Sequence, residues 1–280
     1  MQTKSRLKTE IVAALFLAFA ALAHAQTPAF DVASIKLNKT GSRVRPGFSN
    51  GRFTFSGPVQ WLISLAYHLP TNPSPRLSGG PDWLLGRNDM YDIDAKGSFP
   101  DGLSTSAREQ RESLMLQSLL AGRFRLVIRR ETKEMPAYVL VVDSGGPKLE
   151  KSPLTEKDCA QTVTDGQIPC HQFNGGQGRG LHARAVTMDD LVEFVENWTN
   201  RPLLNQTGIT GLWKLDSQPW VPLDAAMNPP PPGAKADSGA DLADLPTLFQ
   251  VFEKLGLKMK AEKAPVEAYT IVSIQRPTEN

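Results

Sequence analysis

The stretch GRFTFSGPVQWLI, residues 51–63, has a counterpart later in the chain, GLHARAVTMDDLV at residues 180–192. In both, apolar residues first alternate with polar ones and then recur at helical spacing, a pattern that predicts a strand followed by a helix. We predict these helices over residues 59–68 and 188–198, with Thr187 as the N-cap of the second. The alternative is a chance similarity of amphipathic patterns.

The parallel between the two stretches continues along the chain. It comprises two short strands at residues 91–95 and 212–216, two helices at 114–120 and 248–255, and two hairpins at 123–142 and 257–274. In the first hairpin, the loop between the strands contains Pro136. We therefore predict an α+β fold in which two pseudo-repeated strand-helix-strand-helix-hairpin halves pack together.

The first 25 residues have the parts of a secretory signal peptide. Three basic residues precede an apolar run at residues 11–22, and Ala23-His24-Ala25 suits signal peptidase. The run is shorter than the roughly 20 residues with which a helix spans a bilayer. A retained membrane anchor is the alternative. We expect an exported protein, periplasmic or extracellular, that starts at Gln26 and keeps no integral membrane anchor.

Cleavage of the signal peptide makes the chain formally neutral. The full sequence has 31 Lys and Arg against 29 Asp and Glu, and removal of Lys4, Arg6, Lys8 and Glu10 leaves 28 of each. Nucleic-acid binding normally needs a basic excess that displaces counterions. We therefore expect no nucleic-acid partner.

Cys159 and Cys170 are the only cysteines of the chain. In an oxidising compartment they are expected to form a disulfide, which stabilises such a short loop by about 3 kcal/mol on the chain-entropy model. The alternative is a metal site that includes the adjacent His171. Because the chain has no Cys-x-x-Cys or His-x-x-x-His spacing, we expect no metal and no cofactor.

Four segments follow from these patterns. They are a signal peptide at 1–25, a first half at 26–150, a linker with the disulfide at 151–179 and a second half at 180–280. The second half contains a Pro-rich loop at 228–240, whose polyproline stretch is expected to be an exposed spacer. The alternative is that this stretch docks onto an aromatic groove.

No segment carries a known catalytic signature such as Gly-x-Ser-x-Gly, His-Glu-x-x-His or a Walker loop. A Ser/His/Asp set could be assembled from His68 or His182 with Asp82 or Asp92, which only geometry can decide. His68 follows an apolar helix, where a side chain that satisfies terminal carbonyls is the simpler interpretation. The catalytic residues therefore stay unassigned.

Five residues are candidates for ligand binding. Asp92 and Asp94 share one face of a strand, where they could hold a cation or, alternatively, be solvated. Trp83 and Trp220 could line a groove for a carbohydrate or peptide, or pack in the core. His182 lies in the second strand of the repeat and is expected to be half-exposed.

Six short motifs are spread along the mature chain: FDVASIK at 30–36, GGPDWL at 79–84, LLAGRF at 119–124, ETKE at 131–134, TMDDL at 187–191 and TGITG at 207–211. Together they resemble the soil-associated acidobacterial protein family, a domain of unknown function. Some relatives carry a similar domain outside the membrane behind a penicillin-sensor-type metallopeptidase, which implies sensing or binding. The helix-plus-hairpin unit is also weakly similar to short N-terminal domains of secretins and TonB-dependent receptors, which implies protein contacts.

From export, duplication and missing catalytic signatures, we expect a periplasmic or extracellular binding or protein-interaction module, with envelope sensing as its role. Its expected partner is an envelope protein or a small ligand. Export and the tryptophans also fit a secreted hydrolase acting on envelope or soil polymers. A structural envelope component is the third hypothesis.

Overall fold

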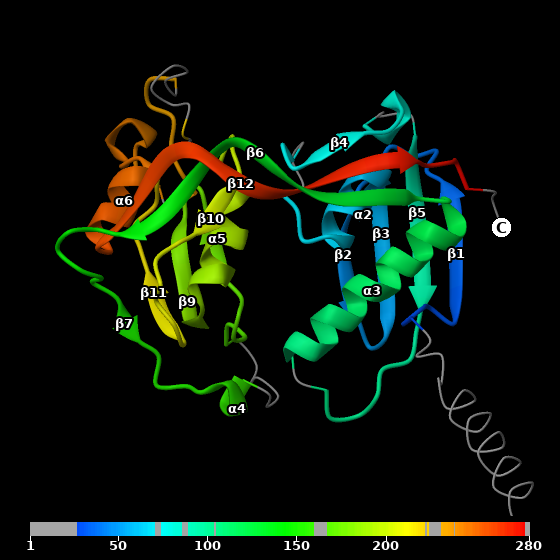
Figure 1. Ribbon diagram of the computed structural model, residues 1–280, viewed down its shortest axis with the longest axis horizontal. Coiled ribbons are helices and arrows are strands. Elements are labelled where there is room, and N and C mark those ends of the chain that lie inside the picture. Colours follow the sequence, from blue (N-terminus) through cyan, green and yellow to red (C-terminus); the bar gives the residue numbers. More distant parts are fainter. Residues whose placement is uncertain are drawn as a thin grey trace, which may run out of the picture.

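The computed structural model describes residues 27–70, 74–85, 89–103, 105–159, 167–221, 223, 231–237 and 239–277. The predicted signal peptide at 1–25 lies outside these residues, as do positions 228–230 and 238 of the Pro-rich loop. Figure 1 shows two lobes joined along one side by a long two-stranded ribbon.

The first lobe is built on an antiparallel sheet with strand order β1-β5-β3-β2. Its strands are β1 (Val32–Leu37), β2 (Val44–Ser49), β3 (Arg52–Pro58) and β5 (Met90–Lys96). Helices α2 (Val59–Ala66) and α3 (Thr105–Arg123) contact each other, and the 3-10 turn η1 (Asp82–Leu84) precedes β5. Phe53, Leu62 and Leu120 are among the residues that form the core between sheet and helices.

The second lobe contains a second antiparallel sheet, in the order β7-β11-β9-β8. Its strands are β7 (Glu150–Lys151), β8 (Asn174–Gly176), β9 (Gly180–Val186) and β11 (Trp213–Asp216). The helical elements are α4 (Glu156–Cys159), α5 (Met188–Glu196), η2 (Leu242–Asp244) and α6 (Leu248–Lys254). Leu191, Trp220 and Phe252 belong to its separate core.

The ribbon consists of β6 (Val127–Val142) and β12 (Leu257–Ser273), which pair antiparallel over nearly their whole length. In the second lobe, β10 (Leu203–Asn205) adds to β6 in parallel, and in the first lobe, β4 (Leu77–Gly79) adds to β12 in parallel. Ile271 near the end of β12 packs in the first core. Both strands therefore run through both lobes (Figure 1).

The predicted fold class, α+β with two pseudo-repeated halves, is wrong. Of the described residues, 37% lie in strands and 23% in helices, so the protein is β-rich with three sheets. The two predicted hairpins do not form, because residues 127–142 are one strand and residues 257–273 are its partner. The amides of Tyr138 and Tyr269 point out of the ribbon, to the carbonyls of Pro202 and Arg76. Pro136 and Pro265 stand two and four residues earlier, so their nitrogens face the same way. Neither β10 nor β4 borders the ribbon there, and a missing N–H costs no ladder bond.

Local signals in the sequence were more reliable. Thr187 is the N-cap of α5, with a capping box in which its side chain accepts from the Asp190 amide and the Asp190 carboxylate accepts from the Thr187 amide. The expected disulfide between Cys159 and Cys170 is confirmed, with a Cα–Cα distance of 5.5 Å. Among the described residues, no helix has the length and apolar character needed to cross a membrane.

Candidate functional site

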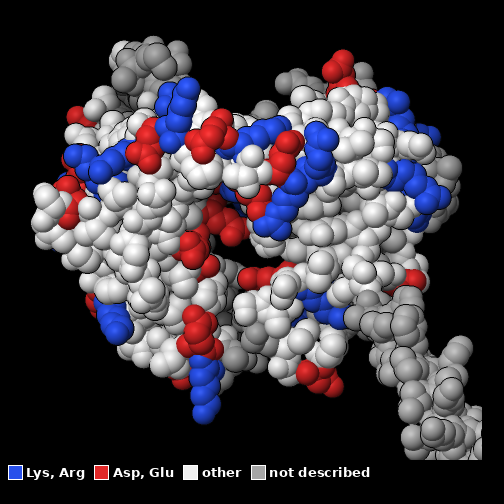
Figure 2. Space-filling model, viewed as in Figure 1, with Lys and Arg blue, Asp and Glu red and all other residues white. Residues whose placement is uncertain are grey.

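A cavity of about 460 Å³ lies between the two lobes. The first lobe contributes the end of α2 and one face of α3, and the second lobe contributes one face of α5 and the segment that follows Cys170. The space-filling view shows the molecule hollowed between the lobes, with acidic side chains bordering the hollow (Figure 2). We call this space the inter-lobe cavity.

Two helix faces with the same spacing line the inter-lobe cavity. From α3 come Glu109, Glu112, Ser113 and Leu116, and from α5 and its C-cap come Asp190, Glu193, Phe194 and Asn197. In each set the residues stand at positions i, i+3, i+4 and i+7, which share one side of a helix. Four carboxylates from two different lobes therefore line one space.

His68 enters the cavity because of the way α2 ends. Tyr67 caps the helix, and His68 follows with a φ of 52°, in the left-handed region. The Leu69 amide donates to the Ser64 carbonyl at 2.8 Å and the His68 amide to the Leu65 carbonyl at 3.5 Å, the two bonds of a Schellman motif. The position normally takes glycine, since a Cβ strains a left-handed backbone by about 1–2 kcal/mol.

The His68 imidazole contacts one residue from each lobe. Its Nε2 lies 2.7 Å from the Ser113 hydroxyl on α3, and its Nδ1 lies 3.1 Å from Glu193 Oε1 on α5. The side chain therefore does not serve as the helix cap that the sequence suggested. Ser113 is 8% exposed, whereas His68 is half-exposed and faces the cavity.

The position of α3 against α2 is fixed one turn further along. Gln117 donates from Nε2 to the Ala66 carbonyl at 2.8 Å, which satisfies one of the free carbonyls at the end of α2. Because Gln117 follows Ser113 by four residues, both side chains lie on the same face of α3. This bond therefore holds the Ser113 hydroxyl beside His68.

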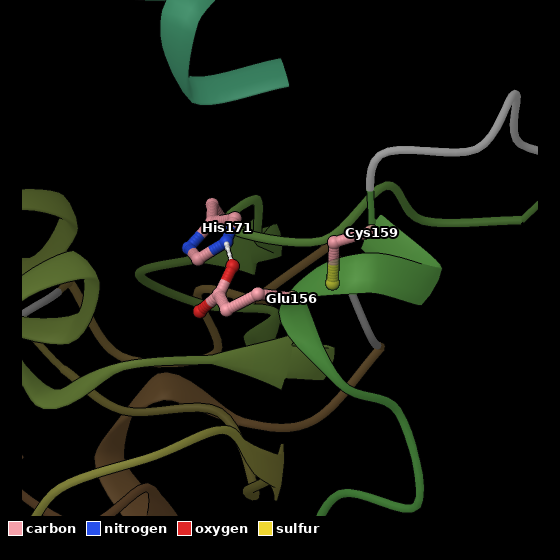
Figure 3. Close-up of side chains that lie close together, drawn as sticks. All are labelled: Glu156, Cys159 and His171. Carbon is pink, nitrogen blue, oxygen red and sulfur yellow. Dashed lines mark hydrogen bonds and ion pairs between the residues drawn. The ribbon is translucent and has the colours of Figure 1, made fainter. Parts of the chain in front are cut away.

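A second histidine of the cavity, His171, lies next to the disulfide. Its Nδ1 is 2.9 Å from Asp190 Oδ2 and its Nε2 is 3.1 Å from Glu156 Oε2. Figure 3 shows the Glu156 carboxylate reaching His171 from α4, the short helix that also carries Cys159. Glu156, Cys159 and His171 have the spacing of metal ligands, but the Cys159 sulfur is bonded to Cys170 and offers no thiolate.

Both cavity histidines have a left-handed backbone. His68 and His171, with φ of 52° and 61°, are two of the four non-glycine residues with positive φ in the part of the chain that the structure describes. Such conformations cost about 1–3 kcal/mol and concentrate at functional sites. The geometry of both imidazoles is thus maintained against a local preference of the backbone.

The cavity shifts the pKa values of several groups. Burial raises the pKa of Glu112 to about 7 and also raises the pKa of Glu109, whose carboxylate is hydrogen-bonded by Gln172. The hydrogen bond to Glu193 raises the pKa of His68. Burial opposes protonation of His171, but Asp190 and Glu156 outweigh it, so its pKa is raised. The two glutamates and the two histidines of the cavity therefore all keep a proton to higher pH than usual.

A buried ion pair also joins the lobes. Arg76, just before β4, donates from Nε and Nη2 to the two carboxylate oxygens of Glu196 at 2.8 and 2.7 Å. Glu196 is the last residue of α5 and is 2% exposed. Burial raises the pKa of Glu196 in spite of the guanidinium. This pair and the His68–Glu193 contact both set the position of α5 relative to the first lobe.

The structure does not bring the five predicted ligand-binding residues together. Trp83 packs against the first core under Arg276, at 5.0 Å from its ring, and Trp220 is buried in the second core. His182, on β9, contacts Asp216 through Nδ1 at 2.6 Å and the Arg179 carbonyl through Nε2 at 3.0 Å. These three side chains belong to separate environments.

Asp92 and Asp94 share one face of β5, as their spacing indicated, but each has its own partner. Asp92 accepts hydrogen bonds from Asn38, at 2.8 Å, and from Ser56. Asp94 forms an ion pair with Arg52, whose hydrogen bonds lower the Asp94 pKa. The two carboxylates thus act in separate contacts on the first sheet.

Sequence reasoning considered His68 and His171 but missed their partners. No local spacing links residues 68, 113 and 193, which come together only when α2, α3 and α5 meet. One signal in the sequence could have pointed to the site. Glu109, Glu112 and Ser113 form a polar face on α3 directly before the buried turns that begin at Met115.

A protein family described as "Protein of unknown function (DUF3738)" matches residues 60–274. The chain belongs to this family. The DUF3738 match begins in α2 and ends just after β12, so it includes every helix that lines the inter-lobe cavity. No curated protein and no solved structure gives a significant match to the chain.

Proposed function

We propose that this DUF3738 protein is an exported binding protein whose inter-lobe cavity takes up a positively charged ligand. The proposal rests on the acidic residues that line the inter-lobe cavity. Glu109 and Glu112 from one lobe oppose Asp190 and Glu193 from the other, and no lysine or arginine belongs to the described lining. Four acidic side chains thus line one space of a chain that is formally neutral after the predicted cleavage.

The pKa of Glu112 supports a cationic ligand. A carboxyl group whose pKa is raised to about 7 lacks sufficient compensation for its negative charge. A bound cation supplies that compensation and releases the proton. Binding is therefore expected to release protons near pH 7, and the amount should fall at pH 8.5, where Glu112 is already ionised.

Aromatic side chains add a second feature of cation recognition. Phe48, Phe173 and Phe194 line the cavity, and the rings of Phe173 and Phe194 stack at 4.6 Å. Aromatic faces attract ammonium groups by roughly 0.5–2 kcal/mol, and quaternary ammonium ligands are the common case. The lining thus suits an alkylammonium ion with apolar substituents.

The same proposal has further parts. We propose that the protein is exported, that it belongs with soil-associated acidobacterial proteins and that it takes part in envelope sensing. The resemblance to short N-terminal domains of secretins and TonB-dependent receptors is included in this proposal. An exported protein with a two-lobed cleft is suited to capture a small ligand outside the cytoplasm. A sensing role adds that an envelope partner distinguishes the occupied from the empty form.

Calorimetric titration tests the binding proposal. The chain from Gln26 is titrated with choline and with spermidine at pH 7 and low salt. Removing two cavity charges in Glu112→Gln/Glu193→Gln should weaken binding at least tenfold, since each charge contributes about 1 kcal/mol at a partly solvated site. The control Glu150→Gln/Glu253→Gln removes two exposed carboxylates away from the cavity. Equal affinities for the two double variants, or no binding of either cation, would refute the proposal.

A further inference from the structure

His68 stands between a hydroxyl and a carboxylate in the inter-lobe cavity. Nε2 is 2.7 Å from Ser113 Oγ and Nδ1 is 3.1 Å from Glu193 Oε1. An ionised carboxylate can only accept a hydrogen bond, so Nδ1 carries the proton and Nε2 of the neutral ring presents its lone pair to the hydroxyl. In this arrangement a histidine can remove the proton of an attacking serine.

We propose that Ser113, His68 and Glu193 form a nucleophilic triad that hydrolyses carboxylic esters with a positively charged alcohol portion. Ser113 Oγ forms a bond to the carbonyl carbon while its proton passes to His68 Nε2. The ester C–O bond then breaks, and the departing oxygen takes that proton. Water repeats these steps on the acyl-serine, which releases the acid and restores Ser113. Glu193 orients the ring and balances the positive charge that His68 carries between the steps.

Several features of the cavity fit this chemistry. Triads are recognised by geometry and not by chain order or by a surrounding motif, so a serine within a helix meets the requirement. The Gln117–Ala66 bond between α3 and α2 holds the hydroxyl in place. The preceding residue, Glu112, lines the same cavity, and its protonated form can donate a hydrogen bond to a developing oxyanion.

The charge of the substrate rests on the proposed function, whereas the triad rests on the His68 geometry alone. A neutral probe and two substrates, one charged and one uncharged, separate the two ideas. The chain from Gln26 is treated with a fluorophosphonate, which needs only an activated serine, and the adduct is mapped by mass spectrometry. Hydrolysis of butyrylcholine is then compared with that of the uncharged ethyl butyrate in a pH-stat.

The variants are chosen to preserve the fold. Ser113→Ala places a good helix former in α3 and should abolish labelling. His68→Gly places the residue that best tolerates a φ of 52° and should slow labelling at least 100-fold. Glu193→Gln keeps the size of the side chain and should slow labelling at least tenfold. Ser118→Ala is the control, because the Ser118 hydroxyl on the same helix donates to the Pro28 carbonyl at 2.7 Å.

An adduct on Ser113 with these rate losses, in variants that unfold at or above the wild-type temperature, supports the triad. Absence of an adduct on Ser113, or unchanged labelling in His68→Gly and Glu193→Gln, overturns it, even if choline binds. If His68→Gly fails to fold, the Glu193→Gln rate decides. A Ser113 adduct without preference for butyrylcholine over ethyl butyrate keeps the triad and overturns the charged substrate.

Discussion

Replacing Glu112 by glutamine should stabilise the protein at alkaline pH and not at acidic pH. The pKa of this carboxyl rises from 4.5 to about 7 on folding, mainly through burial. The folded state therefore holds a proton that the unfolded state has lost between these pH values, and stability falls as the pH rises from about 4.5 to about 7. Glutamine has no charge to bury and removes this contribution.

The size of the effect follows from the shift. One pKa unit corresponds to about 1.4 kcal/mol, so the full shift is worth about 3 kcal/mol above pH 7. Glu112 is only partly buried, and solvent screening reduces the expected gain to about 1–2 kcal/mol. Four other groups also lower stability as the pH rises, because their pKa values are raised: Glu109, Glu196, His68 and His171. They are present in wild type and in Glu112→Gln alike, so they do not contribute to the difference between the two.

Urea unfolding at pH 5, 6, 7 and 8, followed by tryptophan fluorescence, measures the difference. The variant should gain about 1–2 kcal/mol over wild type at pH 8 and almost nothing at pH 5. Glu253→Gln, an exposed change on α6, should leave the pH dependence unaltered. A Glu112→Gln variant with the wild-type pH dependence would refute the assignment of a raised pKa to this residue.

Three further outcomes are expected. Arg76→Met should lower the free energy of unfolding by about 3–5 kcal/mol, because it leaves the Glu196 carboxylate buried without its partner. Urea unfolding should show that the double variant Arg76→Met/Glu196→Gln recovers stability. An Arg76→Met variant as stable as wild type would contradict this. Cys159→Ser/Cys170→Ser should lose about 3 kcal/mol, and a reductant that destabilises this variant as much as it does wild type would show that the disulfide is not the cause. The intact mass of the protein recovered from its native host should correspond to a chain starting at Gln26, and a mass that includes Met1 would refute signal-peptide cleavage.

Sequence patterns predicted the short-range features of this fold well. The helix beginning at Met188 and its cap at Thr187 follow from hydrophobic spacing and from side-chain bonds to nearby amides, which depend on a few adjacent residues. The disulfide follows from the composition of the chain and from its expected compartment. These features need no knowledge of distant contacts.

Long-range pairing was not predictable in the same way. Pro136 was placed in the loop of a predicted hairpin, whereas it lies within β6, where a proline normally removes a ladder bond. Whether that bond is needed depends on which strand lies alongside, and this is decided by residues 77–79 and 203–205. The same holds for the site, since His68 was interpreted from its own helix while its partners come from α3 and α5.

The ribbon determines when the protein can finish folding. Ile271, in β12, belongs to the core of the first lobe, so that lobe cannot complete its core before β12 has been synthesised. Until then β6 has no partner from β12, and closing a loop of more than 100 residues between them is slow. A truncated chain that lacks β12 would leave the strand edge of β6 open to other molecules. Pairing of β12 with β6 therefore completes both lobes in one step.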